Sequence, residues 1–230
     1  MLTKILKESK KFLLEFFFPK TCISCQKEGS YLCSDCLAIL EISSLHQPFK
    51  TKYLDDLYFP LPYQNPILKK LIQNFKYPPF IKELAQPLSS LIIAHFQLIE
   101  KSPKFFQDFF ILPIPQNKKR LKWRGFNQAE ELAKELASFF KVEILNNVLE
   151  KIRETESQVN LTEKERKENL RGAFFLRRPE LIKNRKILLI DDVYTTGATM
   201  EEVAKILKEN GAKEIIGIVI ARANPGEDKI

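Results

Sequence analysis

In the second half of the chain, short apolar runs alternate with amphipathic segments. Runs of strand length occupy residues 109–114, 186–190 and 214–221, and helical spacing of apolar side chains occupies residues 127–140 and 198–210. Gly211 follows the second of these helices, where a left-handed cap favours glycine. Strands that alternate with helices of this length need crossover connections, so the pattern predicts an α/β fold with a mostly parallel sheet flanked by helices.

The first half of the chain has a different pattern. It predicts an extended piece over residues 57–63 and helices over residues 66–75 and 81–100. Residues 2–18 also have mostly helical spacing and end at Pro19. Two interpretations of this amphipathic helix stay open: it packs on the body of the protein, or it makes a peripheral membrane contact through its lysine-rich face.

Composition limits the number of domains. The chain has 230 residues, of which 44% are hydrophobic and 29% charged, enough for one main domain with an appendage. A polar stretch over residues 43–52 separates the two, so we expect an N-terminal module over residues 1–48 and a main domain over residues 49–230. Charged residues interrupt the N-terminal apolar clusters, and no segment approaches the roughly 18 apolar residues of a membrane span. These features predict a cytoplasmic protein.

Four cysteines form two closely spaced pairs, Cys22-x-x-Cys25 and Cys33-x-x-Cys36. In a reducing compartment such a cluster favours metal over disulfides. Each pair can turn two thiolates toward one ion, and four thiolates complete the tetrahedral shell of a structural zinc site. A redox dithiol and fortuitous cysteines are the alternatives.

The segment KILLIDDVYTTGATM, residues 186–200, joins an apolar strand to two carboxylates, a hydroxyl-rich loop and a helix. Asp191 and Asp192 follow the strand directly, where carboxylates can accept hydrogen bonds from two vicinal ribose hydroxyls. Gly197 lets the backbone approach a ligand, and amides at the start of the helix suit a 5-phosphate. Hydroxyl groups for the same phosphate come from Thr195, Thr196 and Thr199. A Walker B strand would also end in acids, but the chain has no G-x-x-x-x-G-K-[ST].

A basic segment follows the strand over residues 109–114. It contains Lys118, Lys119, Arg120, Lys122 and Arg124, and we expect it to form a turn before the next helix. Cations at the ligand-binding edge of a parallel sheet could neutralise a diphosphate leaving group together with a divalent ion. A solvated basic loop is the alternative.

Several motifs together resemble the ComF family of competence-associated proteins, which have a type I phosphoribosyltransferase-like domain. They are LPIP at residues 112–115, RGFNQAE at residues 124–130, DDVYTTGAT at residues 191–199, the Lys76-Tyr77 pair, the four cysteines, and the pattern formed by Arg153, Gln158, Leu161, Arg166 and Asn169. The resemblance implies binding of 5-phosphoribosyl pyrophosphate (PRPP) with Mg2+. It also implies substrate contacts from Gln116, Asn117 and Lys118. Within the DDVYTTGAT motif it adds Val193, Tyr194 and Ala198 to the acidic, threonine and glycine residues already named.

In the type I fold, the segment between the second and third core strands is a mobile lid, and residues 153–169 fall there. The resemblance therefore implies pyrophosphate or lid contacts by Arg124, Arg153, Gln158 and Arg166. For residues 162–168, an exposed helix with Glu–Lys pairs is the favoured interpretation.

Two functions remain open at this point. The first is an enzyme that transfers a phosphoribosyl group from PRPP to an unknown acceptor, linked to DNA uptake. The second is an accessory protein of the DNA-uptake machinery that binds single-stranded DNA and uses PRPP as a regulatory ligand; the net charge of +8 suits either polyanion. Aromatic candidates for base stacking are Phe105, Phe106, Trp123 and Phe126, although core packing explains such residues more often. The two histidines, His46 and His95, are expected to be bystanders.

Overall fold

The computed structural model describes residues 19–153 and 170–223. Backbone contacts divide the chain into two units, Met1–Glu41 and Ile42–Ile230. The sequence places this division a few residues later, after residue 48. The predicted N-terminal helix over residues 2–18 lies outside the described residues, as do Gln158 and Arg166.

The smaller unit contains the cysteines and one short helix, α2 (Ser34–Ala38). The first Cys-x-x-Cys pair lies in a tight turn, in which the Gln26 amide donates to the Cys22 carbonyl over 2.8 Å. The second pair starts α2, where the Cys33 sulfur accepts a hydrogen bond from the Cys36 amide over 3.4 Å. Both pairs therefore turn sharply, as the spacing predicts.

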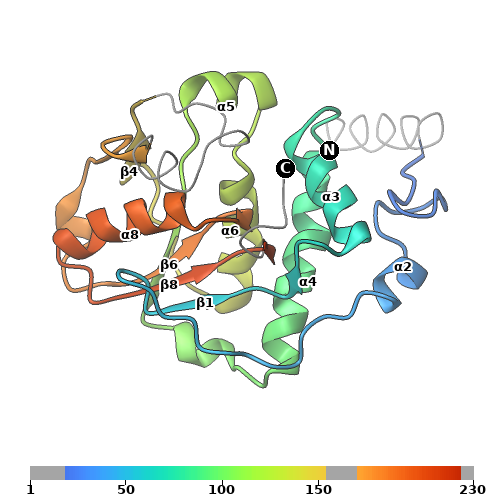
Figure 1. The fold of residues 1–230 in the computed structure, drawn as a ribbon, viewed down its shortest axis with the longest axis horizontal. Coiled ribbons are helices and arrows are strands. Elements are labelled where there is room, and N and C mark those ends of the chain that lie inside the picture. Colours follow the sequence, from blue (N-terminus) through green and yellow to red (C-terminus); the bar gives the residue numbers. More distant parts are fainter. Residues whose placement is uncertain (1–18, 154–169, 224–230) are drawn as a thin grey trace, which may run out of the picture. The chain divides into compact units, whose positions relative to one another are not determined.

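The main unit is built on a four-stranded parallel sheet in the order β1-β8-β6-β3 (Figure 1). The strands are β1 (Asp56–Tyr58), β8 (Glu214–Ile218), β6 (Lys186–Ile190) and β3 (Phe109–Pro113). Ile190 of β6 aligns with Pro113 of β3 and Ile218 of β8, so the three strands end together at one edge. The predicted mostly parallel α/β fold is confirmed.

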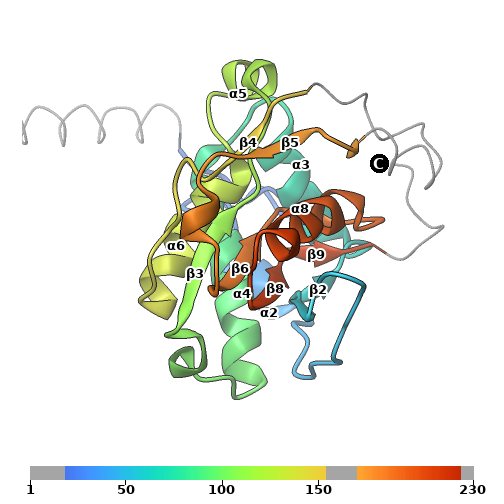
Figure 2. The same ribbon diagram turned by 90° about the vertical axis from the view of Figure 1, so that its left-hand side faces the viewer.

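Helices cover both faces of the sheet. On one side lies α8 (Ala198–Glu209), and on the other lie α4 (Ala85–Leu98) and α6 (Gln128–Phe140) (Figure 2). Alternate residues of β6 explain this: Ile187 and Leu189 belong to the apolar cluster that includes Met200 and Val203 of α8, whereas Leu188 and Ile190 do not. These four residues of β6 are fully buried, which is typical of a central parallel strand.

Two smaller sheets extend from the main one. At its carboxyl edge, β2 (Leu61–Pro62), β9 (Ala221–Arg222) and β7 (Val193–Tyr194) form a three-stranded parallel sheet. β4 (Leu149–Lys151) and β5 (Phe174–Leu176) pair antiparallel. Sequence analysis does not predict the β4–β5 pair, because each strand has only three residues and no apolar alternation.

The remaining helices fit the sequence pattern with two differences. α3 (Pro66–Lys76) forms as predicted, whereas the helix expected over residues 81–100 begins as a 3-10 turn, η1 (Lys82–Leu84), before α4. The basic segment is not a turn but a helix, α5 (Lys118–Arg124). Asn117 caps it by accepting the Arg120 amide over 2.8 Å, and Gly125 ends it with φ +81°. Two further 3-10 turns are η2 (Pro103–Phe106) and η4 (Pro179–Leu181).

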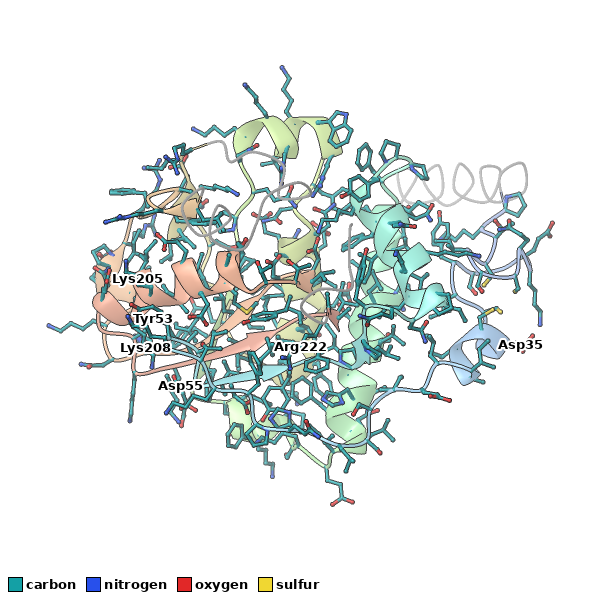
Figure 3. The ribbon with its side chains drawn as sticks, viewed as in Figure 1. Asp35, Tyr53, Asp55, Lys205, Lys208 and Arg222 are labelled. Carbon is teal, nitrogen blue, oxygen red and sulfur yellow. The ribbon has the colours of Figure 1, made fainter. Side chains whose placement is uncertain are left out.

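An ion pair ties the edge strand to α8. The Asp55 carboxylate, just before β1, accepts hydrogen bonds from the Lys208 ammonium over 2.7 Å and from the Ile215 amide of β8 over 2.8 Å (Figure 3). At the other end of the same region, the Arg222 guanidinium lies 4.1 Å from the centre of the Phe49 ring. These contacts hold the connecting segment over residues 43–55 on the sheet.

Across residues 19–153 and 170–223, none of the helices combines the length and the apolar character required to cross a bilayer.

Candidate functional site

A cavity of about 290 Å3 lies at the carboxyl edge of the main sheet. One side is formed by the acidic pair and the threonine loop that follow β6, and the other by α5, the start of α6 and the ends of α3 and β4. The lining residues with charged side chains are Lys76, Arg120, Arg124, Lys151, Asp191 and Asp192. Opposite charges therefore face one space, as a ligand with both hydroxyl and phosphate groups requires.

Backbone amides orient the two carboxylates. The Asp191 Oδ1 atom accepts the Asp192 amide over 2.8 Å, and the Asp192 Oδ1 atom accepts the Val193 amide over 2.8 Å. Asp192 is only 6% exposed, and its Oδ1 atom also accepts a hydrogen bond from the Lys76 ammonium over 3.0 Å. Neither Oδ2 atom accepts a hydrogen bond from the described part of the chain, so both remain available for ligand hydroxyls.

The same surroundings change the acidity of Asp191. Burial, followed by repulsion from the neighbouring Asp192 carboxylate, raises the pKa of Asp191 from 3.8 to about 7. The positive charge of Lys76 opposes this shift but does not cancel it. In the ligand-free protein, the Asp191 carboxyl therefore holds a proton over much of the acidic range.

Gly197 shapes the loop that follows the carboxylates. It has φ +75°, and a Cβ atom there would lie 2.1 Å from the Tyr194 hydroxyl oxygen. Tyr194 is 8% exposed and packs edge-on against Phe49 beneath the loop. Glycine at this position therefore allows both the left-handed backbone and the close approach of a buried ring.

The loop leads directly into α8. Gly197 is the N-cap residue of this helix, and it supplies no side-chain cap. The first amides of a helix have no partner within the helix, so they favour an anion. A small depression of about 20 Å3, lined in part by Thr195, Gly197 and Thr199, lies in front of these amides. This geometry suits a phosphate group.

Cations lie opposite the acidic pair. Arg124 is 8% exposed, and its Nε atom has no hydrogen-bond partner within the described residues. Burial, followed by repulsion from Arg120, lowers the pKa of Lys151 to about 8. An anion between these groups would satisfy Arg124 and relieve the repulsion between Arg120 and Lys151.

Gln128 organises this side of the cavity. It is 1% exposed, and its Oε1 atom accepts hydrogen bonds from Arg124 over 3.1 Å and from the Gln116 amide group. Its own amide group donates to the Phe75 carbonyl over 2.8 Å. One buried side chain thus connects the end of α3, the loop after β3 and the guanidinium of α5.

The four cysteines of the small unit form a second candidate site. Their sulfur atoms all lie within 4.8 Å of one another, and those of Cys25 and Cys33 are 3.5 Å apart. Sulfurs placed about 2.3 Å from a tetrahedral zinc are roughly 3.8 Å apart, so the cluster has the size of a zinc site. Although a hydrogen bond with Ser24 favours the Cys36 thiolate, burial and the neighbouring thiols raise the pKa of Cys36 to about 12. A bound cation would remove this obstacle to four thiolates.

Comparison with known proteins gives consistent results. Residues 122–230 match the phosphoribosyl transferase domain family. The chain is 38% identical to competence protein F of Haemophilus influenzae over 117 residues. The aligned part covers 49% of this chain and 50% of that protein. It is 40% identical to competence protein ComFC of Streptococcus pneumoniae over 114 residues, covering 49% and 47%, respectively. It is 31% identical to the DNA utilization protein YhgH of Escherichia coli over 150 residues, 65% of each chain.

The chain has homologues named competence protein F and ComFC, and it carries a phosphoribosyl transferase domain. The resemblance inferred from the sequence motifs is therefore confirmed. The matched part spans about half to 65% of the length of these relatives.

The main unit brings many of the predicted site residues together. The cavity and the adjoining depression are lined by Gln116, Asn117, Arg124, Asp191, Asp192, Val193, Tyr194, Thr195, Gly197, Ala198 and Thr199. Thr196 lies within the same loop, but Lys118 points elsewhere, being 89% exposed beside Glu150. Arg153 donates to the Arg171 carbonyl over 3.0 Å and does not line the cavity.

Several lining residues have no individual PRPP contact in the sequence analysis. Those with charged or phenolic side chains are Lys76, Tyr77, Arg120 and Lys151, and the others are Ile114, Pro115, Trp123 and Asn127. In the sequence, Lys76 and Tyr77 stand out only as a family pair, and Arg120 only as part of a charge run. The sequence also assigns no role to Gln128 of the RGFNQAE motif, because its hydrogen bonds join it to partners distant in sequence. Among the proposed stacking residues, Phe106 and Phe126 are core residues, whereas Phe105 and Trp123 are exposed.

The acidity of Asp191 gives a prediction about stability. The unfolded chain releases this proton near pH 3.8 and the folded domain near pH 7, so this group makes folding less favourable as the pH rises between these values. We expect Asp191→Asn to remove this pH-dependent loss of stability. The free energy of unfolding that the variant gains over wild type should increase from pH 4 to pH 7 and then stay level. Urea unfolding across this pH range measures the difference, with exposed Asp108→Asn as the control. A gain that decreases with pH would contradict the assignment.

Proposed function

We propose that the protein binds PRPP in this cavity and transfers the phosphoribosyl group to an acceptor, in a process linked to DNA uptake. The observation that supports this proposal is the acidic pair at the end of β6, followed by the glycine loop and the start of α8. Cations lie opposite the pair, and one of them, Arg124, is buried. This arrangement offers acceptors for a ribose diol, amides for a 5-phosphate and cations for a pyrophosphate. The names of the competence and DNA utilization relatives support the link to DNA.

In this proposal each group of residues has a separate task. Asp191 and Asp192 accept hydrogen bonds from the two ribose hydroxyls, and the amides of the loop and α8 hold the 5-phosphate. Arg120, Arg124 and Lys151 stabilise the pyrophosphate as the bond from C1 to its oxygen breaks and the electron pair leaves with it. The acceptor supplies the electron pair for the new bond to C1. Mg2+ bound with PRPP supplies further positive charge to the leaving group.

A mutational test follows from the acidic pair. We expect Asp191→Ala combined with Asp192→Ala to abolish PRPP binding, because both acceptors for the diol are lost. The fold should be retained, because both side chains line the surface of the cavity. Isothermal titration calorimetry with PRPP and Mg2+ measures binding, and circular dichroism measures folding. Asp108→Ala, at an exposed position outside the cavity, is the matched control. Unchanged PRPP affinity in the folded double variant would refute the proposed site.

We also propose that the cysteine cluster binds one structural zinc ion. Four sulfur ligands leave no position for water, so the ion would stabilise the small unit and take no part in transfer. We expect about one zinc per chain by elemental analysis, and Cys25→Ser or Cys33→Ser should lower this content strongly, with Ser30→Ala as the control. A wild-type protein purified without zinc that also takes up none on titration would exclude the proposal.

A second candidate function is favoured by one feature of α5. Its Trp123 is 58% exposed on a helix whose sequence, KKRLKWR, is rich in cations. Exposed aromatic rings among cations are suited to bases of single-stranded DNA. In this alternative the protein binds single-stranded DNA through α5, and PRPP acts as a regulatory ligand without turnover.

Two measurements on the same preparation distinguish the candidates. Transfer predicts pyrophosphate release from PRPP when the right acceptor is present. The alternative predicts no release, and single-stranded DNA affinity that falls steeply with salt and decreases about 5- to 100-fold in Trp123→Ala. Phe105→Ala, an exposed aromatic near the opposite end of β3, should leave that affinity unchanged. Pyrophosphate release without DNA binding would eliminate the alternative.

A further inference from the structure

The ion pair between Lys76 and Asp192 joins two elements that are 116 residues apart in sequence. The Lys76 ammonium lies 3.0 Å from the Asp192 Oδ1 atom, and the side chains are only 24% and 9% exposed. By contrast, the Lys27–Asp35 pair has side chains that are 59% and 70% exposed, in the range where ion pairs contribute little. The Lys76–Asp192 pair is partly buried and lies inside the cavity, so it can affect a ligand.

The fold fixes the position of Lys76 from both sides. Phe75, the preceding residue, is fully buried against Phe126, and its carbonyl accepts the Gln128 side chain over 2.8 Å. The following residue, Tyr77, closes α3 by donating its amide to the Gln73 carbonyl over 2.8 Å. The last turn of α3 is therefore held against the start of α6, and the ammonium stays beside the acidic pair.

The hydrogen bonds divide the carboxylate oxygens into two kinds. On Asp192, the Oδ1 atom receives both the Lys76 ammonium and the Val193 amide. On Asp191, the Oδ1 atom receives the Asp192 amide. The Oδ2 atoms accept no hydrogen bond from the described residues. Each carboxylate therefore has one oxygen that can accept a hydrogen bond from one of two neighbouring hydroxyls.

Charge provides the second argument. Two adjacent carboxylates repel each other, and binding a diol between them requires a nearby positive charge. Burial alone would lower the pKa of Lys76, but the attraction of Asp192 and Asp191 outweighs it and raises this pKa. Lys76 therefore stays charged, and its carboxylate partner is held in place without an added ion.

We propose that Lys76 is a positioning residue for the ribose, whose ammonium orients Asp192 and supplies positive charge that a divalent cation would otherwise have to provide at the acidic pair. This inference rests on the proposed function, because it assumes that the pair binds the ribose.

Ribose 5-phosphate isolates this effect, because it has the diol and the 5-phosphate but no pyrophosphate. We expect wild-type affinity for it, measured by calorimetry, to be nearly the same with EDTA as with Mg2+. In Lys76→Met the affinity in EDTA should decrease about 10- to 100-fold, the usual effect of losing a charged hydrogen bond, and Mg2+ should restore part of it. Lys76→Arg should keep the wild-type independence of Mg2+.

Two controls separate positioning from general stability. Lys82→Met removes a lysine that pairs with Glu131 over 3.2 Å outside the cavity, and it should not change binding. In a double-mutant cycle with Asp192→Asn, the Lys76→Met effect should largely disappear, because Lys76 acts through Asp192. If Lys76→Met does not fold by circular dichroism, Lys76→Gln replaces it in every measurement.

The outcomes distinguish this inference from the proposed function. If wild type binds neither ribose 5-phosphate nor PRPP, the proposed function fails. A different result overturns only the role of Lys76: wild type binds both ligands, and Lys76→Met, or Lys76→Gln in its place, binds ribose 5-phosphate in EDTA with wild-type affinity. Additive effects in the double-mutant cycle would overturn it as well.

Discussion

The parallel pairing of β6 with β3 on one side and β8 on the other is the constraint on which the site depends. Because the three strands run in one direction, the segments that leave them start from a single edge. The acidic pair follows β6 and the segment leading to α5 follows β3, so residues about 70 positions apart face one cavity. A strand slipped by one residue would exchange the faces of its side chains and disrupt the packing of helices on both faces of the sheet.

Polar groups buried beside this edge complete the site. Gln128 contacts a carbonyl of α3, a guanidinium of α5 and a side chain of the loop after β3, so three elements share one side chain. A buried network with satisfied partners holds its members in one arrangement. Among the described residues, two buried atoms of this network beside the cavity lack a hydrogen-bond partner, Arg124 Nε and Gln116 Oε1. Of the two, the Arg124 Nε–H is the donor that an incoming anion would satisfy.

Sequence patterns predict much of the fold and part of the site. The β6 strand, its acidic pair and α8 are recognisable because an apolar run, two carboxylates, one glycine and a helix occur consecutively. The Lys76–Asp192 pair is not, because it depends on how α3 meets the sheet, which no local pattern encodes. The sequence predicts a diphosphate-binding turn where the structure has α5, because a run of cations does not reveal a helix. The signals for the helix are its capping residues, Asn117 and Gly125.

The close contact between Gly197 and Tyr194 limits how this loop can change. Any side chain at position 197 would meet the tyrosine hydroxyl, and it would also require a left-handed backbone. A larger residue at position 197 could be accommodated only after Tyr194 has been replaced by a smaller residue. That replacement would in turn leave a cavity next to Phe49. The order in which substitutions can accumulate is thus restricted, and laboratory evolution of this loop would have to begin at the buried ring.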